Sequence, residues 1–178
     1  YTETLTIGRT DGDMTYVKYK EQVFKVLSDI ISFANDSSYN IVSKLQALVD
    51  ISEVKSVTVE YNGAEHTIDI THNDSDMTFV LDGQKVDTKI TQAIYKSIVG
   101  LAVDGVYKDE TLGDTVMRIK YKGIKSSSDT EIEFKSIDDL YCALIRNGKT
   151  EFTIKKSKLN EFMDLFNTYV ENPEKQGD

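Results

Sequence analysis

The residue types in this chain that could do chemistry are one cysteine, two histidines and several closely spaced carboxylates. Cys142 lies in the alternating run of residues 140–145, which is typical of a half-buried strand, and neither histidine is near it in the sequence. Because a free cysteine without a neighbouring base packs as a small hydrophobe, we predict that Cys142 is a core residue. A single cysteine also excludes an internal disulfide and an all-thiolate metal site.

The two histidines lie among carboxylates, since His66 and His72 flank Asp69 and precede Asp74 and Asp76. Imidazole and carboxylate groups can bind a divalent metal. On a strand, however, His66 and His72 share one face and Asp69 points to the other. The acidic segment also lacks the ligand order of a calcium-binding loop. We therefore interpret these residues as polar hairpin residues and predict no metal site.

Two acidic turns occupy matching places, Asp11-Gly12-Asp13 and Asp74-Ser75-Asp76. Paired carboxylates can do acid–base chemistry when their environments separate their pKa values. A hydrolase that uses Asp13 and Asp76 is therefore one alternative. Turn formation explains both acidic segments more simply.

The triplet Gly148-Lys149-Thr150 resembles the end of a phosphate-binding loop. That motif requires a glycine at position 143, which is alanine, and a helix after the triplet, where residues 151–154 read as a strand. A hairpin turn explains the triplet instead. Because no other catalytic motif is present, we predict a non-enzymatic protein with no catalytic residue and no cofactor.

The charge of the chain is negative but uneven. The 178 residues carry a net charge of −9, which argues against nucleic acid as the partner. Residues 116–160 hold ten Lys/Arg against six Asp/Glu, and the remainder holds eleven against twenty-four. This asymmetry could orient the protein on a partner, although Lys-rich solvated strand faces explain it as well.

An internal repeat is visible in the sequence. Residues 11–17 (DGDMTYV) match residues 74–80 (DSDMTFV) at an offset of 63, and the same offset places Leu5 on Ile68 and Ile7 on Ile70. A fainter third copy relates residues 82–84 to 147–149 and residues 61–63 to 121–123. At this offset the first strand of the first copy would fall before residue 1, so we expect that strand to be absent or supplied by another segment.

Periodicity gives the elements of each copy. Alternating apolar residues predict strands around residues 57–61, 68–70, 77–81, 117–121, 132–134, 140–145 and 152–154, with hairpin turns at Asn62-Gly63 and Asn147-Gly148. Helical spacing predicts one helix over residues 90–102 with a stop at Asp104-Gly105. A second is predicted over residues 159–170, with Ser157 as its N-cap and Pro173 as its stop. The first copy is expected to hold its second and third strands and a short helix starting near Ser28. Residues 39–49 suggest another short helix or an ordered connector.

These elements predict an α+β fold made of repeated β-β-β-α units. There are about three copies, of which the first is incomplete, and mainly antiparallel sheets carry helices packed on one face. The predicted divisions are residues 1–50 for the incomplete first repeat plus connector, 51–112 for the second repeat, 113–172 for the third, and 173–178 for a disordered tail.

The order of features resembles a bacterial family, the domain of unknown function 4340. The residues that carry the resemblance are Leu5-Thr6-Ile7-Gly8, Met14-Thr15-Tyr16-Val17-Lys18, Val23-Phe24-Lys25-Val26 and Ile51-Ser52-Glu53-Val54-Lys55-Ser56-Val57. The resemblance implies an extracytoplasmic domain behind an N-terminal membrane helix, encoded in some cases beside ABC transporters of the gliding-motility type. It implies no active-site residues.

Taken together, the repeat and the resemblance predict an accessory or protein-binding domain at the outer face of a bacterial membrane. Its anchor would be a segment absent from this sequence, and transporter subunits are the candidate protein partners. Contacts would use an open sheet edge or sheet face. A module that binds a small ligand or a polysaccharide between repeats is the main alternative. The sequence leaves the oligomeric state open.

Overall fold

The computed structural model describes residues 3–36, 38–73 and 76–172. The chain divides into two compact units, Tyr1–Val42 and Ser43–Asp178, which we call the N-terminal unit and the C-terminal unit. The division falls after Val42 rather than after residue 50. Residues 43–50 belong to the C-terminal unit, since the Tyr121 hydroxyl donates to the Ala47 carbonyl at 3.0 Å and Arg146 donates to the Gln46 carbonyl at 2.7 Å.

The N-terminal unit is an antiparallel meander in the order β1-β2-β3, followed by a short 3₁₀ helix. Two-residue turns join its strands, with Gly12 (φ 64°) and Lys20 (φ 54°) in the left-handed region. The helix starts at Ser28, as predicted, but it is a 3₁₀ helix. In the segment 39–49, expected as a short helix or an ordered connector, helix is confined to the short turn Ser38–Ile41. The elements are β1 (Leu5–Asp11), β2 (Met14–Tyr19), β3 (Gln22–Leu27), η1 (Ser28–Asn35) and α1 (Ser38–Ile41).

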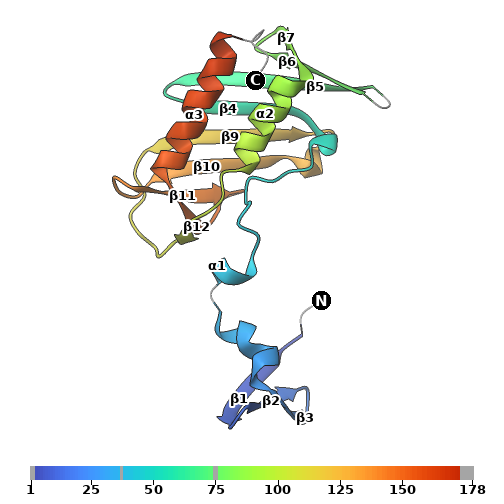
Figure 1. Cartoon of the computed structure of the whole chain (residues 1–178), viewed down its shortest axis with the longest axis vertical. Coiled ribbons are helices and arrows are strands. Elements are labelled where there is room, and N and C mark those ends of the chain that lie inside the picture. Colours follow the sequence, from blue (N-terminus) through green and yellow to red (C-terminus); the bar gives the residue numbers. More distant parts are fainter. Residues whose placement is uncertain (1–2, 37, 74–75, 173–178) are drawn as a thin grey trace. The chain divides into compact units, whose positions relative to one another are not determined.

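The C-terminal unit is one nine-stranded sheet in the order β7-β6-β5-β4-β9-β10-β11-β12-β8. Two runs of four strands, each followed by a helix, meet where β4 pairs antiparallel with β9 at the centre of the sheet (Figure 1). The predicted divisions 51–112 and 113–172 therefore share one sheet. The elements are η2 (Ile51–Glu53), β4 (Val54–Tyr61), β5 (Ala64–Asn73), β6 (Asp76–Leu81), β7 (Gln84–Val86), α2 (Thr88–Val99), β8 (Gly105–Val106), β9 (Thr115–Gly123), η3 (Ser126–Ser128), β10 (Thr130–Ser136), β11 (Tyr141–Arg146), β12 (Lys149–Lys155) and α3 (Lys156–Glu171).

Two of its tight hairpins were predicted from the sequence. Asn62-Gly63 joins β4 to β5 and Asn147-Gly148 joins β11 to β12, with positive φ at both central residues in each turn. This is the backbone that a type I′ turn requires. Asp82-Gly83 also has positive φ at both residues and joins β6 to β7. Strand β7 has three residues and is absent from the predicted three-strand unit.

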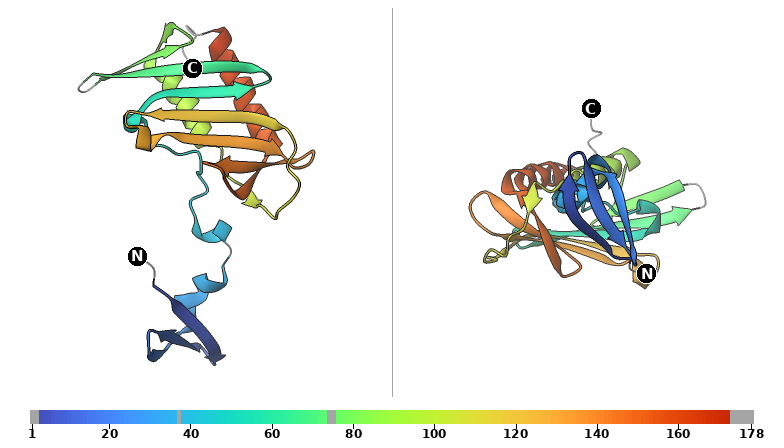
Figure 2. Two further views of the ribbon diagram at one scale, coloured as in Figure 1. Left: turned by 180° about the vertical axis from the view of Figure 1, so that it is seen from behind. Right: turned by 90° about the horizontal axis from the view of Figure 1, so that it is seen from below.

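The core lies between the sheet and the helices α2 and α3, which cover the same face of the sheet (Figures 1 and 2). Alternate residues of each strand point into this core, as in β9, where Met117, Ile119 and Tyr121 are buried. The helices present their apolar stripes to the same layer. The largest fully buried side chains are Tyr121, Phe79, Phe134, Phe166, Ile90, Ile94, Ile98, Met117, Ile119, Ile132, Leu144 and Ile154.

Two helix boundaries differ from the prediction. The N-cap of α3 is Lys155 rather than Ser157, because the Lys156 amide donates to the Leu140 carbonyl at 2.8 Å and the helix therefore starts earlier. Helix α2 ends at Val99 rather than near Asp104-Gly105. Pro173 and the predicted tail lie outside the described residues. Among the described residues, no helix is long and apolar enough to cross a membrane.

Candidate functional site

Cys142 is a core residue. It lies on β11 opposite Ile154 of β12 and is fully buried. Burial raises the pKa of its thiol. A buried thiol held in its protonated form is a poor nucleophile, so the position has no catalytic character.

The two histidines make structural contacts. His66 Nδ1 lies 2.7 Å from Asp82 Oδ2, and the His66 ring packs against Tyr61 and Phe166. His72 Nε2 lies 2.7 Å from the carbonyl oxygen of Val54. Within the described part of the chain, no group of three or more His, Cys, Asp or Glu side chains is placed to hold a metal ion.

The acidic turns and the glycine-lysine triplet are hairpin features. Asp11 pairs with Met14 across a turn and accepts a hydrogen bond from Lys25 at 2.8 Å. Asp76 pairs with Asn73 across the corresponding turn of β5 and β6, whose tip, including Asp74, lies outside the described residues. Asp13 lies in the turn between β1 and β2 of the three-stranded sheet, and Asp76 opens β6 of the nine-stranded sheet. Lys149 and Thr150 open β12, so no helix follows Gly148.

A cluster of charges on the open face of the C-terminal sheet, opposite the helices, was not singled out from the sequence. Arg118 Nη1 lies 2.9 Å from Glu60, and Arg118 Nη2 lies 2.8 Å from Glu133. Arg118 Nε lies 3.1 Å from Glu131 Oε1 as an ion pair without hydrogen-bond geometry. Lys120 also contacts Glu60. We call Glu60, Arg118, Lys120, Glu131 and Glu133 the Arg118 cluster.

The Arg118 cluster favours the ionised forms of Glu60 and Glu133. The hydrogen bond from Lys120, reinforced by the one from Arg118, lowers the pKa of Glu60. Burial alone would raise the pKa of Glu133, but hydrogen bonds from Thr115 and Arg118 outweigh it and lower this pKa. An acid–base catalyst needs a pKa brought toward neutrality. These shifts run the other way, so the cluster is built as an ion-pair network.

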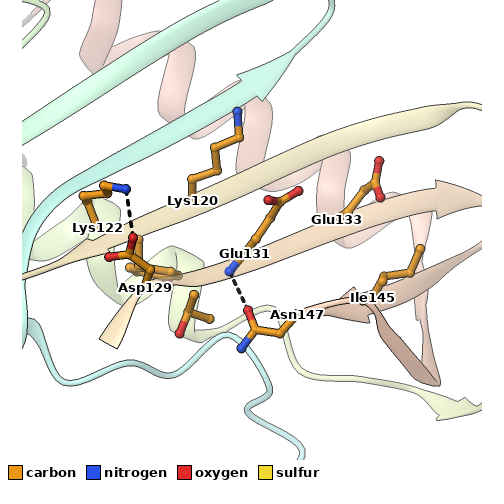
Figure 3. Close-up of a pocket in the computed structure, with 10 residues that line it drawn as sticks. Lys120, Lys122, Asp129, Glu131, Glu133, Ile145 and Asn147 are labelled. Atoms are coloured by element: carbon orange, nitrogen blue, oxygen red, sulfur yellow. Dashed lines mark hydrogen bonds and ion pairs between the residues drawn. The ribbon is translucent and has the colours of Figure 1, made fainter. Parts of the chain in front are cut away.

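A groove of about 540 Å³ lies beside the cluster on strands β9, β10 and β11. Figure 3 shows Lys120 and Lys122 on one strand and Glu131 and Glu133 on the next, with Asn147 beside Glu131. Its Lys122 pairs with Asp129 at 2.8 Å, and the Glu131 amide donates to Asn147 Oδ1 at 2.8 Å. Because Lys122 is already paired with Asp129 and Lys120 with Glu60 of the neighbouring strand β4, a charged ligand would have to displace existing contacts.

The N-terminal unit presents a different kind of surface. Seven of the large hydrophobic residues on its described chain are exposed by 40% or more, whereas Val17 and Ile31 are buried. Large contiguous apolar patches on the surface of a protein commonly mark an interaction site. The exposed residues are Leu5, Ile7, Val23, Phe24, Leu27, Ile30 and Phe33.

The edges of the two sheets also differ. Strands β1 and β3 are the edges of the N-terminal sheet, with seven and six residues, and neither has an outer partner among the described residues. The nine-stranded sheet ends in β7 and β8, with three and two residues. Short edge strands limit pairing with other chains, and long apolar ones invite it. The N-terminal sheet is therefore the candidate protein-binding surface.

The fold and this surface define an antiparallel α+β protein with two sheets. The nine-stranded sheet has short edge strands, and the three-stranded sheet has long ones. Comparisons of the chain with protein-family models, with curated proteins and with solved structures find no match.

Proposed function

We propose that the chain is a non-enzymatic protein-binding module whose N-terminal sheet accepts a strand from a partner protein at the outer edge of β1. The observation that carries the proposal is an open-edged sheet with exposed apolar side chains, joined to a unit whose edges are short and whose core is covered. Strand addition provides affinity through backbone hydrogen bonds and specificity through alternate side chains.

The size of the N-terminal unit supports the need for a partner. Units near 40 residues bury too little surface to be stable without disulfides, metals or association. Residues 1–42 contain no cysteine, and the described residues hold no metal-binding group. Association with a partner would supply the stability that so small a unit lacks.

The backbone of β1 indicates where a partner strand would bind. Asp11 and Met14 flank a two-residue turn and therefore form a hydrogen-bonded pair. Hydrogen-bonded and non-hydrogen-bonded pairs alternate along an antiparallel ladder. The N–H and C=O groups of Leu5, Ile7 and Thr10 therefore point away from β2. The side chains of Leu5 and Ile7 lie on the face that carries Val17. A strand with apolar residues at alternate positions would cover both.

We also propose that the chain is built from repeated units, of which the N-terminal unit is the incomplete one. Ile7 pairs with Val17, and Ile70 pairs with Phe79. If the two pairs are equivalent, the offset in residue number is 63 from Ile7 to Ile70 and 62 from Val17 to Phe79. The irregular pairing between Ile7 and Thr10 accounts for the extra residue. Val17 rather than Tyr16 is thus the counterpart of Phe79, and both are buried.

For the setting, the family resemblance supports a module tethered at the outer face of a bacterial membrane, with transporter subunits as partners. Fractionation of the full-length protein in its own cells tests this part alone. Recovery in the membrane or envelope fraction is expected, and a purely cytosolic protein would contradict the proposed setting.

The binding proposal is tested by mild cross-linking and mass spectrometry in those cells. Ile7→Pro removes one outward N–H of β1, while Lys85→Pro places a proline at the equivalent outward position of the edge strand β7 and is the matched control. We expect one set of partners to be captured by the wild type and by Lys85→Pro and lost with Ile7→Pro. Equal capture by all three proteins would show that the β1 edge is not the binding site.

A further inference from the structure

Strand β3, at the other edge of the N-terminal sheet, is unusually apolar for an edge strand. Its sequence is QVFKVL, and Val23, Phe24 and Leu27 are 65%, 43% and 49% exposed. A long apolar edge strand of this kind is a template for pairing with another chain. Proteins normally protect such an edge with charges, prolines or bulges, and β3 pairs with β2 without a register shift.

The backbone groups on this free edge follow from the hairpin. Tyr19 and Gln22 close the two-residue turn at residues 20–21 and form a hydrogen-bonded pair. Alternation along the ladder then leaves the N–H and C=O groups of Val23 and Lys25 and the N–H of Leu27 on the outer edge, since the carbonyl of Leu27, the N-cap of η1, accepts the first bond of that helix. A partner strand can replace the water that binds these groups in a monomer.

The side chains of β3 are self-complementary. In an antiparallel pair of two β3 strands with Lys25 on the two-fold axis, Val23 faces Leu27 of the second copy and Phe24 faces Val26 of the second copy. Phe24 and Val26 lie on the Val17 face, while Val23 and Leu27 lie on the opposite face. Apolar residues therefore meet apolar residues on both faces. Placing Phe24 on the axis instead would put Val23 opposite Lys25.

The charge on the axis is locally compensated. Like charges directly opposite one another destabilise a strand pair. Lys25 Nζ lies 2.8 Å from Asp11 Oδ2 and 5.4 Å from the centroid of the Tyr16 ring within its own copy. Each lysine is thus drawn toward β1 and β2, away from the axis.

We infer that β3 pairs with β3 of a second copy of this chain, forming one continuous antiparallel sheet across a two-fold axis. Such an interface is isologous, since the same strand is used by both copies. It uses the β3 edge and leaves β1 free, so it goes beyond the proposed binding function and can fail or succeed independently of it.

The register is tested with a cysteine on the axis in the whole chain. The two Lys25 residues would form a hydrogen-bonded pair, whose opposite Cβ atoms lie about 5.5 Å apart, so a disulfide between cysteines at this position forms after a local adjustment of the strands. Lys25→Cys should give a covalent dimer under mild oxidation, and the native Cys142 gives no background because it is fully buried. Lys20→Cys, in the exposed turn, is the control and should stay monomeric on denaturing gels. A dimer that forms through Phe24→Cys but not Lys25→Cys would contradict the proposed register.

The oligomeric state is tested by light scattering during gel filtration over a range of concentrations. The wild type and Lys85→Pro should be dimers, and Val23→Pro and Val23→Lys should be monomers with unchanged circular dichroism. Ile7→Pro should stay dimeric, which separates this interface from the β1 site. A wild-type protein that is monomeric throughout and gives no Lys25→Cys cross-link would overturn the inference. So would a dimer that persists in both Val23 variants.

Discussion

The N-terminal and C-terminal units are built from the same kind of antiparallel hairpins, yet they differ in how far their apolar residues are buried. In the C-terminal unit Phe79 is 2% exposed on β6, and in the N-terminal unit Phe24 is 43% exposed on β3. The difference is one of completeness: nine strands and two helices enclose a core, and three strands with one 3₁₀ helix do not. Hairpin quality alone does not make a stable unit.

The helices account for much of this difference. Helix α2 buries Ile90, Ile94 and Ile98 at the spacing of an α-helical stripe. In the 3₁₀ helix η1, residues three apart lie above one another. Ile31 is buried, whereas Ile30 and Phe33 lie on one row that stays exposed. A 3₁₀ helix of two or three turns cannot cover a sheet as a four-turn α-helix does.

The largest expected effect comes from core truncation. Phe134→Ala should cost about 3–5 kcal/mol of unfolding free energy, because Phe134 is fully buried in the core of the C-terminal unit. Phe24→Ala, the same change in the open unit, should cost less than about 1 kcal/mol to a monomeric chain. Urea unfolding of both variants followed by tyrosine fluorescence measures the difference. Similar losses would contradict the contrast between the units.

Local stability should also be lower in the N-terminal unit than in the C-terminal unit. Amide protons of β2 should exchange with solvent through openings that cost several kcal/mol less than those of β9, since β9 lies at the centre of a nine-stranded sheet. Native-state hydrogen exchange with fragment mass spectrometry gives both values in one experiment. If the proposed dimer forms, protection of β3 should rise with protein concentration and protection of β9 should not.

The Arg118 cluster should contribute a smaller amount. Arg118→Gln leaves Glu60, Glu131 and Glu133 facing one another without their shared cation, and we expect a loss of about 1–2 kcal/mol at neutral pH. Removing one carboxylate as well, with Glu133→Gln, should recover part of that loss. A double variant that is no more stable than Arg118→Gln would show that repulsion among the glutamates is not the cause.

The smallest expected effect is a pH dependence. The folded pKa values of Glu60 and Glu133 lie below their ordinary values, so their contribution to stability is complete above the unfolded pKa of about 4.3 and is lost as pH falls through the folded values. Chemical unfolding at a series of pH values should show this loss in the wild type. The loss should be smaller in Arg118→Gln, whose glutamates lack the arginine that lowers their pKa values.

The hairpins and the two long helices were predictable because local chemistry determines them. Asn62-Gly63 and Asn147-Gly148 need positive φ at both central residues, and α2 and α3 carry stripes that match an α-helical period. The three-residue strand β7 is too short for any period to be read. The N-cap of α3 depends on the distant Leu140 carbonyl, which no local pattern contains.

The candidate sites were harder to predict, for two physical reasons. The Arg118 cluster joins strands far apart in the sequence, although the alternation of Arg118 and Lys120 on one strand and Glu131 and Glu133 on the next carried a signal that could have been read. In the proposed repeat, the sequence match puts Tyr16 opposite Phe79, whereas the irregular pairing between Ile7 and Thr10 moves the counterpart of Phe79 by one residue to Val17, and the sequence does not show this irregularity. A one-residue shift moves a side chain to the other face of a sheet, and Tyr16 was therefore placed where Val17 lies.

The central position of the β4–β9 pair has a consequence for synthesis of the protein. Glu60 on β4 and Arg118 on β9 are 58 residues apart, so the ribosome makes the whole first run of strands and α2 before the partner of β4 exists. At a synthesis rate of about 5–20 residues per second, the edge of β4 that pairs with β9 stays unpaired for roughly 3–12 seconds. During that interval the nascent C-terminal unit carries a long exposed edge that the finished nine-stranded sheet no longer has, and a chaperone that shields extended strands would bind it there.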